Sequence, residues 1–146
     1  MFADLLKRLT APEPEALPFD DARLALAALL VRLARADGEY AQIEAEYIEH
    51  ILKHRYAMSD VETAAVRQEA EALEAEAPDT VRFTRAIKDA VPYDDRVGVV
   101  EALWAVVLAD GVRDEEEDAL IRMVAPMLGI NDRDSNLARK RVEAQG

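Results

Sequence analysis

Two stretches of the sequence carry the same pattern, and together they restrict the fold more than any other feature. Residues 36–44 read ADGEYAQIE and residues 109–117 read ADGVRDEEE, so each has Ala-Asp-Gly with a Glu seven residues beyond the Asp. An apolar segment precedes each stretch and an amphipathic segment follows it. Equivalent residues, such as Leu30 and Leu103, lie 73 positions apart. The pattern therefore predicts a duplicated helix-loop-helix.

The two copies, at about residues 24–60 and 97–133, are not expected to fold as separate domains. Each copy leaves a long apolar stripe that it cannot bury by itself, so the two stripes are expected to pack together in one shared core. We expect residues 20–146 to form a single domain, preceded by a short helix and a proline linker at residues 1–19. A chain of 146 residues buries roughly 68–70% of its unfolded surface and needs no disulfide or metal to fold.

The composition favours helices over strands. Only five glycines and six prolines occur, and no segment shows the strict apolar-polar alternation of a half-buried strand. The sequence predicts an all-α bundle of about seven to eight helices, with their ends marked by caps, glycines and prolines. The expected helices lie at about residues 3–9, 21–36, 41–55, 60–76, 80–91, 95–108, 114–128 and from 132 onward.

Charge and cysteine content exclude several classes of protein. The formal net charge is -12, which repels nucleic acids and anionic membranes, so we expect no nucleic-acid partner. The absence of cysteine excludes thiolate metal sites and fits a reducing compartment. The opening MFADLLKRLT lacks the features of a secretory signal, and no apolar run is long enough to span a bilayer. We expect a cytoplasmic protein without membrane insertion.

The Glu of each repeat is the residue that most needs an explanation. Gly38 and Gly111 are explained as helix stops. Glu44 and Glu117, however, fall on the apolar stripe of the helix that follows, by the helical period of 100° per residue. A carboxylate directed at a core is costly unless it is paired, hydrogen-bonded or bound to a cation.

Capping explains one of the two carboxylates more readily than the other. Glu117 follows Asp114 with the spacing of a capping box, in which it reaches back to the start of its helix. For Glu44 the corresponding position is Ala41, which has no side-chain acceptor, so the capping explanation is expected to fail there. This difference favours an interaction of Asp and Glu across each loop.

Two interpretations of the loops remain open. Asp-Gly, five residues and a Glu match the second half of a calcium loop, but the first half lacks its acidic ligands, which excludes an ordinary EF-hand. In the first interpretation, the loops bind calcium or magnesium through Asp37, Glu44, Asp110 and Glu117. In the second, the carboxylates are structural, with Arg32, Arg35 or Arg96 as counter-charges.

A separate candidate lies on the helix after the first loop. Glu46, His50 and His54 follow at successive intervals of four residues, and a carboxylate with two imidazoles is a ligand set for a transition metal. The alternative is a solvated flank of the helix. Ile51 stands where a zinc protease would have its general base, and no catalytic arrangement is recognisable elsewhere, so we expect no enzyme.

The repeated pattern also carries a family resemblance. ADGEYAQIEAEYI and ADGVRDEEEDALI, each after an apolar helix, resemble the TerB-like family of tellurite-resistance proteins over about residues 20–135. They are similar as well to the cytoplasmic domain of some membrane-anchored DnaJ-like co-chaperones. The resemblance implies an all-helical fold of two related halves, a role in bacterial stress or tellurite response, and metal-binding acidic residues. Asp37, Glu44, Asp110 and Glu117 match that pattern, whereas Tyr40 and Ala41 make the first loop less acidic.

These observations predict a non-enzymatic TerB-like module that acts by binding, with a divalent cation at the two loops. The alternative is a metal-independent scaffold whose acidic residues are structural. We expect an unidentified protein partner or a homodimer in either case. The amphipathic segment MFADLLKRL, which is too short to be stable as an isolated helix, is expected to dock on the bundle or on a partner.

Overall fold

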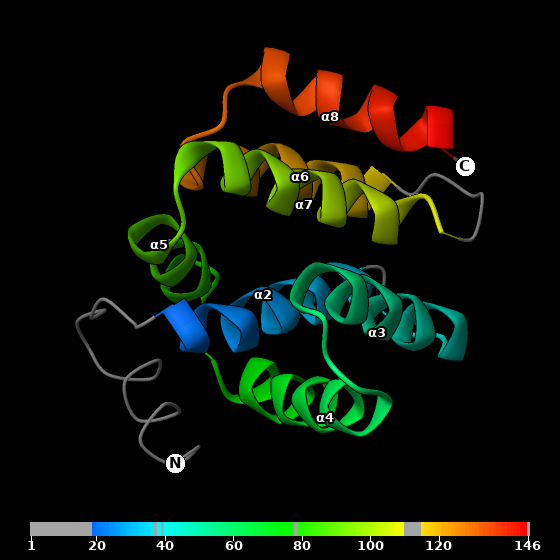
Figure 1. The fold of residues 1–146 in the computed structure, drawn as a ribbon. Coiled ribbons are helices and arrows are strands. Elements are labelled where there is room, and N and C mark those ends of the chain that lie inside the picture. The colour runs from blue at the N-terminus through cyan, green and yellow to red at the C-terminus, as the bar shows by residue number, and fades with distance from the viewer. Residues whose placement is uncertain (1–18, 37, 39, 78, 110–114, 146) are drawn as a thin grey trace.

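The computed structural model describes residues 19–36, 38, 40–77, 79–109 and 115–145. Within these residues the chain is all helical, which confirms the predicted fold class (Figure 1). The segment in which the helix at residues 3–9 and the proline linker were predicted lies outside the described residues. The helices are α2 (Phe19–Ala34), α3 (Gln42–Tyr56), α4 (Asp60–Glu76), α5 (Val81–Ala90), α6 (Tyr93–Val107), α7 (Glu115–Met127) and α8 (Asp132–Gln145).

The two apolar helices, α2 and α6, form the middle of the bundle. Between Leu24 and Ala34 every residue except Arg32 is buried, and the apolar residues of α6 from Val99 to Val107 are buried as well, except Ala105. These helices pack against each other and contribute about half of the buried residues of one continuous core. The two copies share one core because neither copy can bury its apolar stripe by itself.

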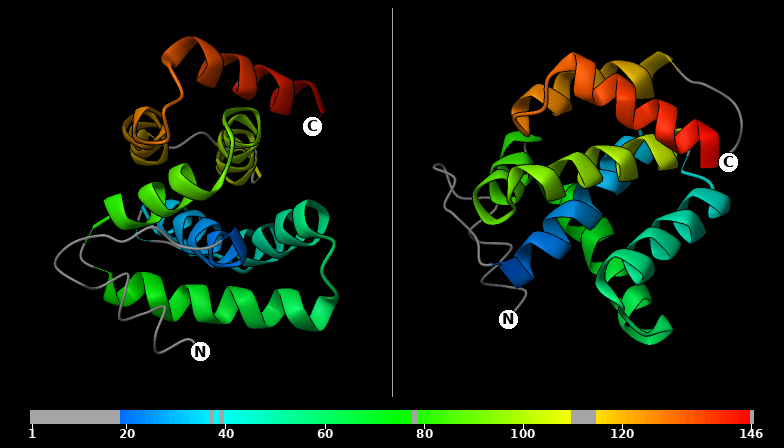
Figure 2. Two further views of the ribbon diagram at one scale, coloured as in Figure 1. Left: turned by 60° about the vertical axis from the view of Figure 1, so that its left-hand side comes forward. Right: turned by 45° about the horizontal axis from the view of Figure 1, so that its top comes forward.

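The remaining helices cover this pair in layers. α4 packs on the side of α2 that faces away from α6, while α8 lies across α6 and α7 on the opposite side of the molecule (Figures 1 and 2). α5 connects the two halves and packs mainly on α2. None of the described helices combines the length and the apolar character needed to cross a membrane.

The repeat extends further than the sequence pattern predicts, because α4 and α8 are also equivalent. Ser59 accepts a hydrogen bond from the Glu62 backbone N–H at 3.2 Å, and Asn131 accepts one from the Asp134 backbone N–H at 2.8 Å. These two N-caps lie 72 rather than 73 residues apart, since one residue is missing from the second copy near the preceding turn. Each half therefore consists of three helices, not two.

The turns before α4 and α8 are equivalent too. Ala57 has a φ of 52° and Gly129 a φ of 79°, so both adopt the left-handed conformation that ends a helix. The Ile130 N–H donates to the Ala125 carbonyl at 2.9 Å and the Gly129 N–H to the Pro126 carbonyl at 2.9 Å, which together make a Schellman motif. Helix α7 thus ends at Met127, close to the expected end at about residue 128.

Helix α6 begins at Tyr93, slightly before the expected start at about residue 95, with Pro92 as its N-cap residue and without a side-chain cap. The proline fixes the extended backbone at this start. Asp94 and Asp95 lie within the first turn, where their negative charge is favoured by the helix dipole.

Candidate functional site

The candidate site lies where the two repeated loops meet the bundle. The C-terminal ends of α2 and α6 and the N-terminal ends of α3 and α7 all lie on one side of the molecule, at the right of Figure 1 and of the right-hand view in Figure 2. Of the four predicted cation ligands, Glu44 and Glu117 are described. Asp37 and Asp110 lie outside the described residues, so their part in the site stays a prediction.

Glu44 is buried in the first turn of α3, with 7% of its surface exposed. One carboxylate oxygen, Oε1, accepts a hydrogen bond from the Ala41 backbone N–H at 3.1 Å. The expectation that capping fails at Glu44 is therefore wrong. Ala41 offers no acceptor, but the return bond of a capping box needs only the Glu side chain and the backbone N–H of the N-cap residue.

Glu117 occupies the equivalent place in α7, with 3% of its surface exposed. It belongs to a first turn of four consecutive acidic residues, 115–118, at the positive end of the helix dipole. Both carboxylates thus face the core from the start of a helix, as their spacing in the sequence predicts. The second copy places more negative charge around its carboxylate than the first, in which Glu44 is the one acidic residue of the first turn.

Arg32 and Arg35, two of the proposed counter-charges, form ion pairs with Glu74 of α4. Arg32 Nε lies 2.9 Å from Glu74 Oε2, and Arg35 Nη1 lies 2.6 Å from Glu74 Oε1. Arg96, the third, stacks on the ring of Tyr93 at 5.7 Å and donates to the Lys88 carbonyl. The two ion pairs with Glu74 connect the end of α2 to the last turn of α4.

Tyr40, beside the first ADG sequence, is attached to α4 as well. Its hydroxyl donates to Glu71 Oε2 at 2.6 Å, and the guanidinium of Arg35 lies 5.2 Å from its ring centre. Burial, and then the hydrogen bond to the Glu71 carboxylate, raise the pKa of Tyr40 from 10.0 to about 12. Arg67 also pairs with Glu71, and it binds Glu49 of α3.

Only part of this network is indicated by the spacing of its residues in the sequence. Arg67 and Glu71 are four residues apart on one helix, which is the spacing of an ion pair. The contacts of Tyr40 with Glu71 and of Arg67 with Glu49 join residues from different helices. Nothing in their spacing indicates that these residues meet.

The histidine candidate is only partly assembled. His50 and His54 lie one turn apart on α3 with their ring centres 4.3 Å apart, whereas Glu46 accepts a hydrogen bond from Gln42 Nε2 at 3.4 Å. Among the residues that the structure describes, no group of three or more His, Asp or Glu side chains is gathered to hold a metal ion. The three-residue set predicted from Glu46, His50 and His54 is therefore not formed.

The fold and the site define a class of protein: an all-helical bundle of two related halves, in which a buried carboxylate follows the position of each repeated loop. The family model described as "Tellurite resistance protein TerB" matches residues 23–140, and the chain belongs to this family. A search of curated proteins and a search of solved structures each find no match.

Proposed function

We propose that the protein is a cytoplasmic, non-enzymatic TerB-family module of the bacterial stress or tellurite response that binds calcium or magnesium at its two ADG loops. The observation that supports this proposal is the burial of Glu44 and Glu117 at equivalent positions, on the same side of the molecule. Carboxylate oxygens are the ligands that both cations prefer. Asp37 and Asp110, seven residues earlier, would complete each site together with loop carbonyls and water.

The second loop is proposed to bind the cation more tightly than the first. Four acidic residues occupy the first turn of α7, and their combined charge attracts a divalent cation. In the first copy, one oxygen of Glu44 already accepts the Ala41 N–H, and the hydroxyl of Tyr40 is bonded to Glu71. Both contacts reduce the number of oxygen atoms near the first loop that are free to bind a cation.

Calorimetric titration of the metal-stripped chain with calcium and with magnesium tests this proposal. Glu117→Gln should abolish the tighter binding event, and Glu44→Gln should affect only the weaker one. Glu46→Gln is the matched control, because this exposed side chain lies on the same helix as Glu44 and the substitution should change the affinities little. Binding of neither cation to the unmodified chain would refute the proposal.

The alternative function is a metal-independent scaffold for a protein partner or for a second copy of the chain. The hydrogen bond from Ala41 to Glu44 favours it, since this contact gives the carboxylate a purely structural role. Gln serves the same capping role as Glu. On this alternative, Glu44→Gln should leave stability almost unchanged and no cation should stabilise the chain.

A further inference from the structure

The two histidines of the chain, His50 and His54, are both on the same exposed flank of α3. Their ring centres are 4.3 Å apart and their planes meet at 69°, so one imidazole edge points at the other ring. The ring of Tyr47 lies 5.8 Å from that of His50. Side-chain rotations alone can therefore turn one nitrogen of each imidazole toward a common point.

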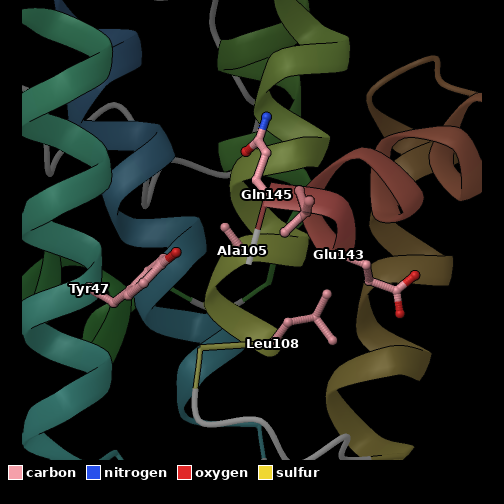
Figure 3. A pocket seen from close by; sticks show the side chains of 6 residues that line it. Tyr47, Ala105, Leu108, Glu143 and Gln145 are labelled. Atoms are coloured by element: carbon pink, nitrogen blue, oxygen red, sulfur yellow. The ribbon is translucent and has the colours of Figure 1, made fainter.

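An open groove between α3, α6 and α8 lies beside these rings. It has a volume of about 380 Å³, and both histidines line it. It adjoins a hollow in which Tyr47 lies on one side of Ala105 and Glu143 on the other (Figure 3). The groove leaves room next to the imidazoles for an ion and its water ligands.

The charged groups that line the groove beside the histidines are engaged in other contacts. Arg55 Nη2 donates to the Asp95 carbonyl at 2.8 Å, and Glu101 Oε1 accepts from Arg141 Nε at 3.1 Å. Arg55 fits there because residue 98 is glycine: an added Cβ would lie 2.8 Å from Arg55 Nη1. Arg55 is thus held against α6.

The other half of the molecule shows what makes this groove distinctive. At the position equivalent to Ala105 stands Arg32, whose long side chain crosses to Glu74 and lines the corresponding hollow with Met123. The positions equivalent to the two histidines are Met123 and Met127. On the α3 side two histidines therefore lie beside the small Ala105. On the α7 side two methionines occupy the equivalent positions, and the large Arg32 replaces the alanine.

We propose that His50 and His54 form a two-imidazole site for a divalent transition-metal ion, with water in the groove completing its coordination. Two histidines at i and i+4 on a helix present their rings to one ion, as in the zinc-binding helix of metalloproteases. Imidazole suits zinc, nickel and copper, whereas calcium and magnesium prefer oxygen. Among the three ions copper should bind most tightly. The proposal is independent of the cation proposed for the ADG loops.

Calorimetric titration of the tag-free chain with nickel and with zinc tests the site. One equivalent should bind, and His50→Gln or His54→Gln should each weaken binding by about tenfold or more, since even outer-shell substitutions commonly have such effects. The double variant Met123→Leu with Met127→Leu is the matched control at the equivalent positions and should bind both ions like the unmodified chain. Paramagnetic nickel should also broaden the imidazole proton resonances at one equivalent.

Two results would overturn the proposal. One is the absence of saturable nickel and zinc binding to the unmodified chain. The other is binding that persists in both histidine variants, which would place the ion elsewhere. Because both histidines are exposed, their Gln variants should keep the helical circular dichroism of the unmodified chain, and this measurement accompanies each titration.

Discussion

Arg32 is the one residue between Leu24 and Ala34 that is not buried, and it stabilises two helices at once. Beside its ion pair with Glu74, its Nη2 donates to the Glu74 carbonyl at 3.2 Å and to the Ala77 carbonyl at 2.9 Å. Carbonyls at a helix end have no partner within the helix. The guanidinium of Arg32 therefore caps the C-terminal end of α4.

Arg32→Ala should lower the free energy of unfolding by about 2 kcal/mol, because it removes one of the two ion pairs of the largely buried Glu74 and the donors to two backbone carbonyls, while Arg35 still pairs with Glu74. Urea denaturation measures the change. Lys53→Ala is the control: the pair of Lys53 with Asp60 is exposed and should contribute less than about 1 kcal/mol. Equal losses in the two variants would contradict the role given to Arg32.

The pKa of Tyr40 predicts a pH effect with a definite sign. Folding raises this pKa from 10.0 to about 12, so the stabilisation from the protonated hydroxyl is complete below about pH 10 and is lost as the pH rises through about 12. In an ultraviolet titration of the four tyrosines, Tyr40→Phe should remove a component that ionises near pH 12. Tyr47→Phe should keep that component. Retention of the late component in Tyr40→Phe would show that another tyrosine is responsible.

At the residue scale, the sequence predicted the burial of Glu44 and Glu117 but only part of their contacts. Helical periodicity places both on an apolar stripe, and this is a local property. The bond to Ala41 was not predicted, because the residue type at an N-cap indicates its side-chain acceptor, whereas the backbone N–H makes this contact.

At the scale of the element, α3 has an alanine at each end where another residue type would cap the helix better. Its N-cap residue, Ala41, has the extended backbone of a cap (φ -80°, ψ 157°) but no side-chain acceptor. Its C-cap residue, Ala57, is left-handed, a conformation that is costly for a residue with a Cβ. Both ends of the helix can therefore be improved by single substitutions.

Ala41→Ser should stabilise the fold by about 1 kcal/mol, because the serine hydroxyl would complete a capping box with Glu44. Thermal or urea unfolding measures the gain. Ser59→Ala removes the equivalent group from the existing box of α4 and should cost about the same. A destabilised Ala41→Ser would mean that the start of α3 does not have the described geometry.

Ala57→Gly should also stabilise the chain, by about 1 kcal/mol, since glycine adopts the left-handed conformation without the steric cost. Gly129→Ala at the equivalent turn should destabilise it by a similar amount. An added Cβ at Gly129 meets Lys88 and Arg96 only at 3.7 Å or more, so the cost is one of backbone conformation rather than of space. Urea unfolding should therefore show a higher free energy of unfolding for Ala57→Gly and a lower one for Gly129→Ala.

Helix positions were predictable because prolines, glycines and caps mark the ends. The third helix of each repeat was not recognised as equivalent, for two reasons. The register changes from 73 to 72 residues at the preceding turn, and the apolar residues differ, with Leu73 of α4 matched by Gln145 of α8. Only the shared N-caps and left-handed turns reveal the relation.

At the scale of the whole molecule, duplication explains both the core and the placement of the loops. Neither α2 nor α6 could bury its apolar surface within its own half, so the two pack together, which the sequence predicted. The angles between helices follow from side-chain packing and were not predictable. They bring both loop-bearing ends to one side of the molecule (Figure 1).

The most direct test of the proposed cation site is thermal unfolding of the metal-stripped chain in calcium or magnesium, compared with sodium at matched ionic strength. A cation at one hundred times its dissociation constant should stabilise the fold by about 2.7 kcal/mol, and Glu117→Gln should lose most of this gain. Melting temperatures that are the same in the divalent salts and in matched sodium would contradict the proposal and leave the two loops as structural turns.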